Sequence, residues 1–230
     1  MIKLELFYAP TACCDVTLIA LEHLAVPYEL HLVRFGKGDH RQPGYMKLNP
    51  KGKVPLLLAD DRPLTETTAI LSYLAKTHPQ SGLLPLGNGE YEDAKIVADL
   101  AWVASGIHPL ITRIFLPNKV CDLPEASSRV KEIASEEIKS SLALIEERLS
   151  KHDWMYGTWS ALDGYIFWVH NRLQLSGFDL TPFLRFSAHG LRMMEQPSVQ
   201  RAWVKRAALQ EQLKAEGLVG PPALRFQPAS

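Results

Sequence analysis

The spacing of hydrophobic and polar residues changes once along the chain, near residue 80. Before that point, short alternating segments typical of strands are interleaved with segments whose apolar residues recur at helical spacing. Strands are predicted at Ile2–Tyr8, Tyr28–Val33, Val54–Ala59 and, after a turn at 60–64, in one further short segment. Helices are predicted at Cys13–Leu24, with Thr11 as N-cap, at Thr67–Lys76, and as a short piece before the third strand. This order predicts a compact α/β layer over residues 1–80.

The pattern after residue 80 is that of linker and helices. Residues 81–90 are rich in Gly, Pro and Ser and lack periodicity, which indicates a linker between domains. Helical spacing then predicts helices over 91–116, 130–149, Ser160–Leu173, Leu184–Met194 and Ser198–Leu213. Residues 91–216 are therefore expected to form an all-α domain, with a capping box at Ser160–Asp163. The tail, 217–230, is expected to wrap over the surface or to be disordered.

Composition narrows the class of partner. Hydrophobic residues make up 47% and charged residues 22% of the chain, as in an ordinary globular protein. Lys plus Arg equals Asp plus Glu at 25 each, so no net charge steers the chain toward nucleic acid or an anionic membrane, and a small-molecule partner is expected. No apolar run reaches the roughly 18 residues of a membrane span, and the alternating start is unlike a signal peptide. A cytoplasmic protein is predicted.

The three cysteines, Cys13, Cys14 and Cys121, argue for a reducing compartment. Their number is odd, and their spacing fits neither a disulfide framework nor a zinc site. No metal is therefore expected.

The most specific motif is Asn49-Pro-Lys-Gly-Lys-Val-Pro55, followed by Glu66 and Thr67. Pro55 enters a strand without a donor for the ladder, and a cis bond before it would expose the N–H and C=O of Val54 to an extended peptide. Glu66 and Thr67 stand where a strand gives way to a helix, so backbone N–H groups and the Thr hydroxyl can hold a carboxylate. The motif therefore predicts a site for a short, extended peptide that carries a carboxylate.

These motifs resemble those of the glutathione transferases. Leu64–Ile70 matches the pattern L-T-E-[ST]-x-A-I, and Tyr8-Ala-Pro-Thr-Ala-Cys13 is similar to the Y-S-P-G-A-C motif of the bacterial beta class. The resemblance covers nearly the whole chain. It implies a thioredoxin-like domain with a cis Pro55, an all-helical substrate domain and a homodimer. It also implies a role in detoxification, in which glutathione, with no other cofactor, is joined to a small hydrophobic electrophile.

The ends of glutathione suggest which residues would bind them. Glu66 would take the α-ammonium and Thr67 the neighbouring carboxylate, while Lys37 or Lys53 would pair with the glycyl carboxylate. The backbone of Val54 would pair with the cysteinyl part.

Three residues near the first turn could meet the glutathione sulfur. Cys13 is expected at the start of a helix, where unpaired N–H groups and the helix dipole favour a thiolate, although it could also be a small buried hydrophobe. Cys14 could donate to the thiolate or be an ordinary helix residue. Tyr8 could donate its hydroxyl, but a Tyr that ends a first strand is more often in the core, and we favour that interpretation.

The second domain carries one further catalytic candidate. His108 in Trp102–His108 falls where the resemblance places an active-site histidine, as acid, base or hydrogen-bond donor, although a lone His on an apolar helix is more often structural. Pro109 follows where the class often has a basic residue, and it is expected to bend the helix. Residues that could line the second-substrate pocket, or simply fill the core, are Arg113, Phe115, Tyr165 and Trp168.

Three functions fit this pattern. The leading one is conjugation of the glutathione thiolate to an electrophile. The second is a glutathione-dependent thiol-disulfide oxidoreductase, in which Cys13 forms a mixed disulfide that a second glutathione resolves. The third is a non-catalytic ligand-binding or interaction module of the same fold. The identity of the electrophile cannot be derived from the sequence.

Overall fold

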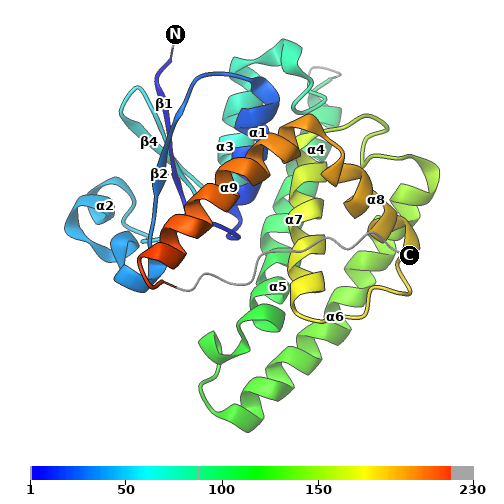
Figure 1. Ribbon diagram of the computed structural model, residues 1–230. Helices are drawn as coiled ribbons and strands as arrows, with labels where there is room; N and C mark the ends of the chain where they lie inside the picture. The colour runs from blue at the N-terminus through cyan, green and yellow to red at the C-terminus, as the bar shows by residue number, and fades with distance from the viewer. Residues whose placement is uncertain (1, 87–88, 219–230) are drawn as a thin grey trace. The chain divides into compact units, whose positions relative to one another are not determined.

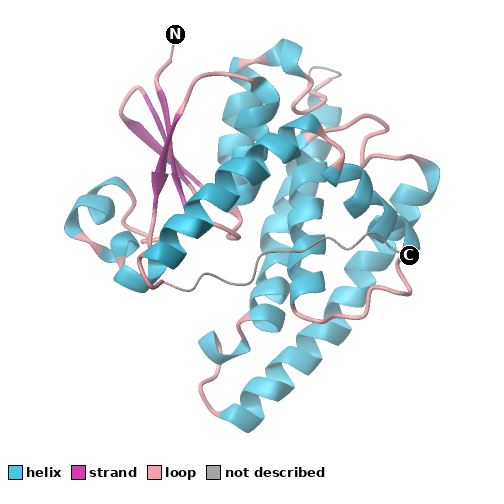
Figure 2. Cartoon of the chain, in the orientation of Figure 1, coloured by secondary structure: helices cyan, strands magenta, loops and turns pink. Residues whose placement is uncertain are grey.

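The computed structural model describes residues 2–86 and 89–218. Contacts divide these residues into two compact units. The first unit holds the described residues up to Leu86 together with those from Glu195 onward, and the second holds those from 89 to Met194. Strands lie in the first unit, and the described part of the second consists of helices and loops (Figure 2).

The first unit is built on a four-stranded sheet with the order β2-β1-β3-β4 (Figure 1). β1 (Leu4–Tyr8) runs parallel to β2 (Glu29–Leu32) and antiparallel to β3 (Leu56–Ala59), which pairs antiparallel with β4 (Arg62–Thr65). β3 lies inside the sheet and all its residues are buried. This position explains why its sequence is an apolar run and does not alternate.

Four α-helices complete the first unit: α1 (Cys14–Leu24), α2 (Pro43–Leu48), α3 (Thr67–Thr77) and α9 (Pro197–Ala215). α1 packs against both α3 and α9, and the last of these runs along it in Figure 1. Because it is covered from two directions, α1 is buried from Cys14 to Glu22. The sequence pattern had grouped the residues of α9 with the second domain, whereas the contacts group them with the first.

The second unit is a helical bundle. Its elements are α4 (Glu90–Trp102), a π-helical turn (Val103–Ile107), α5 (His108–Phe115), α6 (Pro124–Lys151), α7 (Ala161–Leu175) and α8 (Leu184–Met194). α7 is the central helix, in contact with α5 and α8, and every residue from Ala161 to Asn171 is buried. The predicted capping box is confirmed, since Ser160 and Asp163 bond each other's backbone at the start of α7.

Two local expectations can be compared with the structure. Thr11 is not the N-cap of α1: that position is taken by Cys13, and Thr11 lies in the preceding turn with φ 70°. A π turn, Val103–Ile107, directly precedes His108 in front of the helix that contains Pro109, and the bend expected there stays a prediction. A Pro has no N–H for the carbonyl one turn earlier, which favours such an irregularity. The predicted tail lies almost wholly outside the described residues.

One helical stretch, Glu90–Phe115, is long and apolar enough by composition to cross a membrane. This stretch differs from the expectation that no apolar run reaches the length of a membrane span, although acidic residues stand at its start. The indication is weak, because core helices of soluble proteins meet the same criterion.

Candidate functional site

Cys13 lies at the junction of β1 and α1. Its backbone is already helical (φ −61°, ψ −12°), and its side chain does not cap the helix. The Cys13 Sγ instead lies 3.6 Å from the carbonyl oxygen of Val54, which belongs to the loop that enters β3. The thiol is only partly buried. The fold therefore brings together two predicted site residues that are 41 positions apart.

Cys14 and Tyr8 have different surroundings from Cys13. The Cys14 thiol is fully buried and donates to the carbonyl of Ala9 at 3.0 Å, while the Ala9 N–H approaches the same sulfur at 3.2 Å. Burial, with the nearby Cys13 and Asp15, raises the pKa of the Cys14 thiol well above its usual range. The Tyr8 hydroxyl is buried and donates to Asp15, and burial likewise raises its pKa. Both side chains therefore have hydrogen-bond partners within the first unit.

Two partly buried hydrogen bonds hold the loop before β3 in shape. Asn49, which is 1% exposed, donates to the Lys53 carbonyl at 2.6 Å, and the Tyr45 hydroxyl donates to the same oxygen at 2.6 Å. Val54–Pro55 is a cis peptide bond, which confirms the expectation from the motif. The Lys53 side chain is exposed. The loop thus presents Val54 from a fixed backbone.

Glu66 is the N-cap of α3 and has φ 75°, a conformation that non-glycine residues seldom adopt. Such strained positions occur preferentially at functional sites. Thr67 follows as the first helical residue and is buried. The carboxylate of Glu66 pairs with the ammonium of Lys51, which also donates to the Thr65 hydroxyl at 2.6 Å. In this structure the Glu66 carboxylate therefore already binds an alkylammonium, that of Lys51, as it could bind the ammonium of a ligand.

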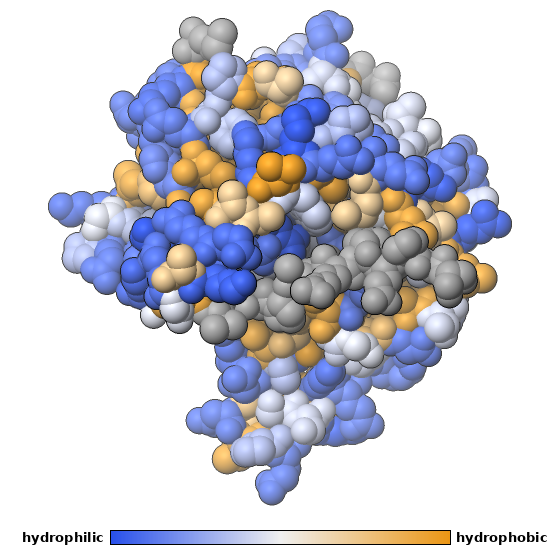
Figure 3. Space-filling model, in the orientation of Figure 1, coloured by the Kyte–Doolittle hydropathy of each residue, from blue (hydrophilic) through white to orange (hydrophobic). Residues whose placement is uncertain are grey.

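Lys37 lies at the opposite edge of the first unit's sheet, after β2. Its ammonium contacts Glu216 at 2.5 Å, and Arg34 Nε pairs with the same carboxylate at 2.9 Å. The hydrogen bond from Lys37 is the main reason that the pKa of Glu216 falls to about 2. Figure 3 shows hydrophilic side chains gathered at this C-terminal end of α9. Lys37 is thus engaged with a carboxylate of the chain itself.

His108 in the second unit belongs to a buried aromatic group. Its Nδ1 lies 2.8 Å from the Tyr165 hydroxyl, and its ring centroid is 4.4 Å from that of Trp168. Tyr165 and Trp168 are buried in α7, at 1% and 4% exposure. These two aromatic residues therefore orient the imidazole. Because they are buried, they offer little surface that could line a pocket.

The other two pocket candidates lie on α5. Arg113 is exposed, and Phe115 is half buried with the Arg172 guanidinium 4.2 Å above its ring. Arg172 also lies 5.9 Å from the Trp168 ring. Sequence reasoning did not identify the contact between Arg172 and Phe115, because the two residues come from different helices.

Sequence reasoning also missed Asp15 and Arg206, which form a buried ion pair of 3.3 Å between α1 and α9. One signal was available: Asp15 is an acidic residue within a helix that is otherwise apolar on most sides. Its partner could not have been chosen, because Arg206 lies 191 positions away.

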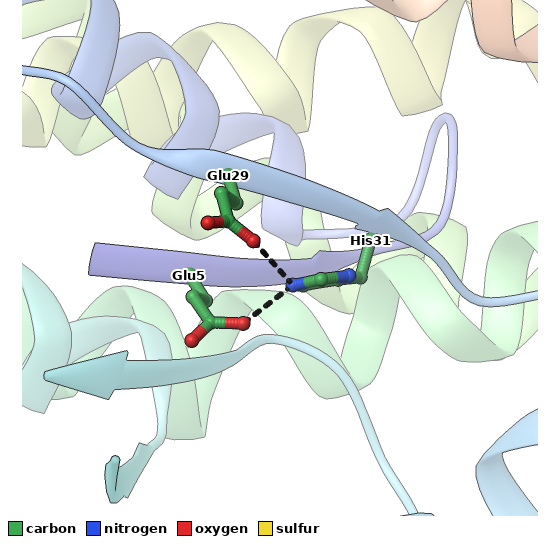
Figure 4. Close-up of side chains that lie close together, drawn as sticks. All are labelled: Glu5, Glu29 and His31. Atoms are coloured by element: carbon green, nitrogen blue, oxygen red, sulfur yellow. Dashed lines mark hydrogen bonds and ion pairs between the residues drawn. The ribbon is translucent and has the colours of Figure 1, made fainter. Parts of the chain in front are cut away.

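Glu5, Glu29 and His31 form the cluster of the described residues whose donor atoms are close enough to hold a metal ion (Figure 4). His31 Nε2 lies 2.7 Å from Glu5 and 3.8 Å from Glu29. Lys3 also pairs with Glu5 at 2.7 Å and with Glu29 at 3.7 Å. The hydrogen bond from Lys3 is the main cause that lowers the pKa of Glu5. The chain's own cation thus balances these carboxylates.

Comparisons by family model, by sequence and by structure identify the same kind of relative. The family described as "Glutathione S-transferase, N-terminal domain" matches residues 12–77. Glutathione S-transferase GST-4.5 of Xanthomonas campestris pv. campestris is 30% identical, and glutathione S-transferase GstA of Escherichia coli O157:H7 is 32% identical. Both alignments cover 94% of this chain and 100% of the relative. A glutathione transferase homologue from Sulfitobacter, solved with bound glutathione, superposes with a TM-score of 0.77 at 26% identity, over 95% of this chain and 100% of that one.

Proposed function

The chain belongs to the glutathione S-transferase family and is a glutathione transferase, and from this premise we propose that it conjugates the glutathione thiolate to small hydrophobic electrophiles. The observation that carries the proposal is the 3.6 Å approach of the Cys13 sulfur to the Val54 carbonyl. A cysteinyl residue paired with the Val54 backbone would have its own sulfur near that of Cys13.

The remainder of the glutathione site follows from the same unit. Glu66 accepts an ammonium already, and Thr67 begins a helix whose unpaired N–H groups favour a carboxylate. Lys37 and the exposed Lys53 are the cations we assign to the glycyl carboxylate. Two internal pairs, Lys51–Glu66 and Lys37–Glu216, would have to give way to the ligand.

The second unit supplies our candidates for the electrophile. We assign His108, oriented by Tyr165 and Trp168, as an acid, base or donor toward the reacting groups. Arg113 and Phe115 on α5 are proposed to contact the second substrate, while burial limits Tyr165 and Trp168 to supporting roles. Specificity for the electrophile would be determined by these helices.

The second candidate function is glutathione-dependent disulfide reduction. Here the Cys13 thiolate attacks a mixed disulfide of glutathione, releases the other thiol as thiolate and becomes S-glutathionylated; a second glutathione then releases Cys13 and leaves as glutathione disulfide. The partly exposed thiol of Cys13 favours this chemistry. Cys14 could not act as a resolving thiol without leaving its buried bond to Ala9.

Cys13→Ser separates the two functions. A serine hydroxyl can donate a hydrogen bond to the glutathione thiolate but cannot form a disulfide, so conjugation should persist while mixed-disulfide reduction is abolished. Both activities are measured on the same preparations, with glutathione affinity by calorimetry. Loss of conjugation would contradict the role proposed for Cys13 in that reaction, and intact reduction would contradict Cys13 as the disulfide nucleophile. If affinity and both activities are unchanged, Cys13 lies outside the site.

The family also supports three wider proposals: a homodimer, a cytoplasmic location and membership of the bacterial beta class, the last on the Tyr8–Cys13 motif. A detoxifying role follows from the conjugation chemistry. Sedimentation of the purified chain tests the first of these directly.

A further inference from the structure

Ion pairs join α9 to both ends of α1. At the C-terminal end of α1, Glu22 pairs with Arg201 at 3.1 Å and with Lys205 at 2.6 Å. At the N-terminal end, Asp15 pairs with Arg206 at 3.3 Å. The first group contains two basic side chains that are almost half exposed, whereas Asp15 and Arg206 are 3% and 5% exposed. Only the second pair lies in the helical turn that begins at Cys13.

The Asp15 carboxylate is enclosed by groups from three elements. The Tyr8 hydroxyl from β1 donates to Oδ1, Arg206 Nη1 from α9 faces Oδ2, and the Cys14 thiol follows Cys13 on α1 itself. The Arg206 guanidinium also stacks over the Trp203 ring at 4.6 Å. A buried charge of this kind is strongly unfavourable unless a fixed opposite charge accompanies it.

The position of the pair connects it to the reactive sulfur. Asp15 lies two residues after Cys13, in the same first turn of α1. A negative charge there opposes ionisation of a neighbouring thiol, while the helix N-terminus favours it. The positive charge of Arg206 offsets the negative charge of Asp15. Because Asp15 and Arg206 are both buried, solvent screens their charges weakly.

We propose that Arg206 is a positioning residue for the transferase reaction, one that neutralises Asp15 at the start of α1 and thereby keeps the Cys13 thiolate accessible at neutral pH. This rests on the proposed function in so far as Cys13 meets the glutathione sulfur. The pair acts on Cys13 through charge, so its two halves have opposite effects. Removal of Arg206 leaves an anion beside the thiol, whereas neutralisation of Asp15 leaves a cation.

The test is the pH dependence of alkylation at Cys13, followed by peptide mass spectrometry so that Cys121 does not contribute. Arg206→Met should move the midpoint of the rate profile upward, and Asp15→Asn should move it downward, each by about half a pH unit or more. The double variant Asp15→Asn/Arg206→Met should return toward the original midpoint, and Arg206→Lys should remain near it. Arg201→Met is the matched control, since it weakens the α9–α1 contact at the far end of α1.

A merely structural role for the pair gives a different result. If the single variants shift the midpoint in the same direction, if neither shifts it, or if Arg201→Met shifts it equally, the proposal is wrong. Circular dichroism and thermal unfolding establish that each variant is folded before alkylation. Glutathione affinity by calorimetry is recorded separately: opposite midpoint shifts with no change of conjugation in any variant would support the charge coupling and contradict the proposed role of Cys13.

Discussion

At the scale of single residues, the two adjacent cysteines have opposite environments. The Cys13 thiol lies partly exposed beside the Val54 carbonyl, whereas the Cys14 thiol is enclosed and bonded to the Ala9 backbone. The two residues are consecutive, so their side chains point in different directions. A ligand could reach the Cys13 thiol, whereas the Cys14 thiol fixes the β1–α1 turn. We therefore propose that the Cys13 sulfur, and not that of Cys14, takes part in the chemistry.

Cys14→Ala tests this division. The substitution removes the acceptor of the buried Ala9 N–H and the donor to its carbonyl, so stability should fall by roughly 1–3 kcal/mol. The kcat/KM for conjugation should change less than twofold. Urea unfolding and steady-state kinetics measure the two quantities. An unchanged stability with a large loss of kcat/KM would instead make Cys14 a functional thiol.

At the scale of elements, α7 depends on the residues at its start. Both carboxylate oxygens of Asp163 are used: Oδ2 accepts from the N–H and hydroxyl of Ser160, and Oδ1 accepts from the Met155 N–H and contacts His189 Nε2. Asp163 and His189 are both fully buried. Asp163 therefore anchors the N-terminus of the central helix, the preceding loop and α8 at one point.

Asp163→Ala should consequently destabilise the protein by about 3–5 kcal/mol, because it leaves several buried donors without an acceptor. The matched variant Ser160→Ala removes the hydroxyl of the same capping box and should cost about 1 kcal/mol. Chemical denaturation of both variants gives the comparison. Equal losses would mean that Asp163 is only a helix cap.

Most elements could be predicted from their sequences for clear reasons. The helix Leu184–Met194 was predicted with its observed bounds, and the apolar run of β3 was recognised because a central strand excludes polar residues. The partner of α9 could not be predicted. Its apolar stripe shows that one face is covered but not by which helix, and the ion pairs that fix it to α1 join residues far apart in the chain.

At the scale of the whole molecule, acid should weaken the second unit through His170. Its imidazole lies on α7 against Phe186, with ring centroids 5.1 Å apart, and so close to Gly190 that a Cβ there would lie 2.7 Å from the ring. Burial, reinforced by His189, lowers its pKa from 6.5 to about 4. Between these two pH values the unfolded chain binds a proton that the folded chain does not.

The contribution of neutral His170 is therefore complete above pH 6.5 and is lost as the pH falls toward 4, by about 3 kcal/mol in total. His170→Gln should flatten the decline of unfolding free energy across this window relative to the parent chain. Urea unfolding at pH 4.5, 5.5, 6.5 and 8 measures it, with the value at pH 8 correcting for packing changes. Parallel curves for the two proteins would show that His170 does not carry the acid sensitivity.

The candidate site was predictable where local motifs define it and not where distant segments meet. Pro55, Glu66 and Thr67 were identified because a strand entry and a helix start have a recognisable chemistry. The ion pairs Lys51–Glu66 and Lys37–Glu216 were not predicted, because surface ion pairs depend on side-chain directions. In the binding mode we propose, glutathione replaces these two internal contacts.

We propose that glutathione binds the first unit with its α-ammonium on Glu66. The most direct measurement is a calorimetric cycle that titrates glutathione, and the analogue glutaryl-Cys-Gly that lacks the ammonium, into the parent chain and Glu66→Gln. Because the Glu66 side chain is 65% exposed, its loss should weaken glutathione only about tenfold. Binding of the analogue should be the same for both proteins. Equal weakening of the two ligands, or no weakening of either, would show that Glu66 does not bind the α-ammonium.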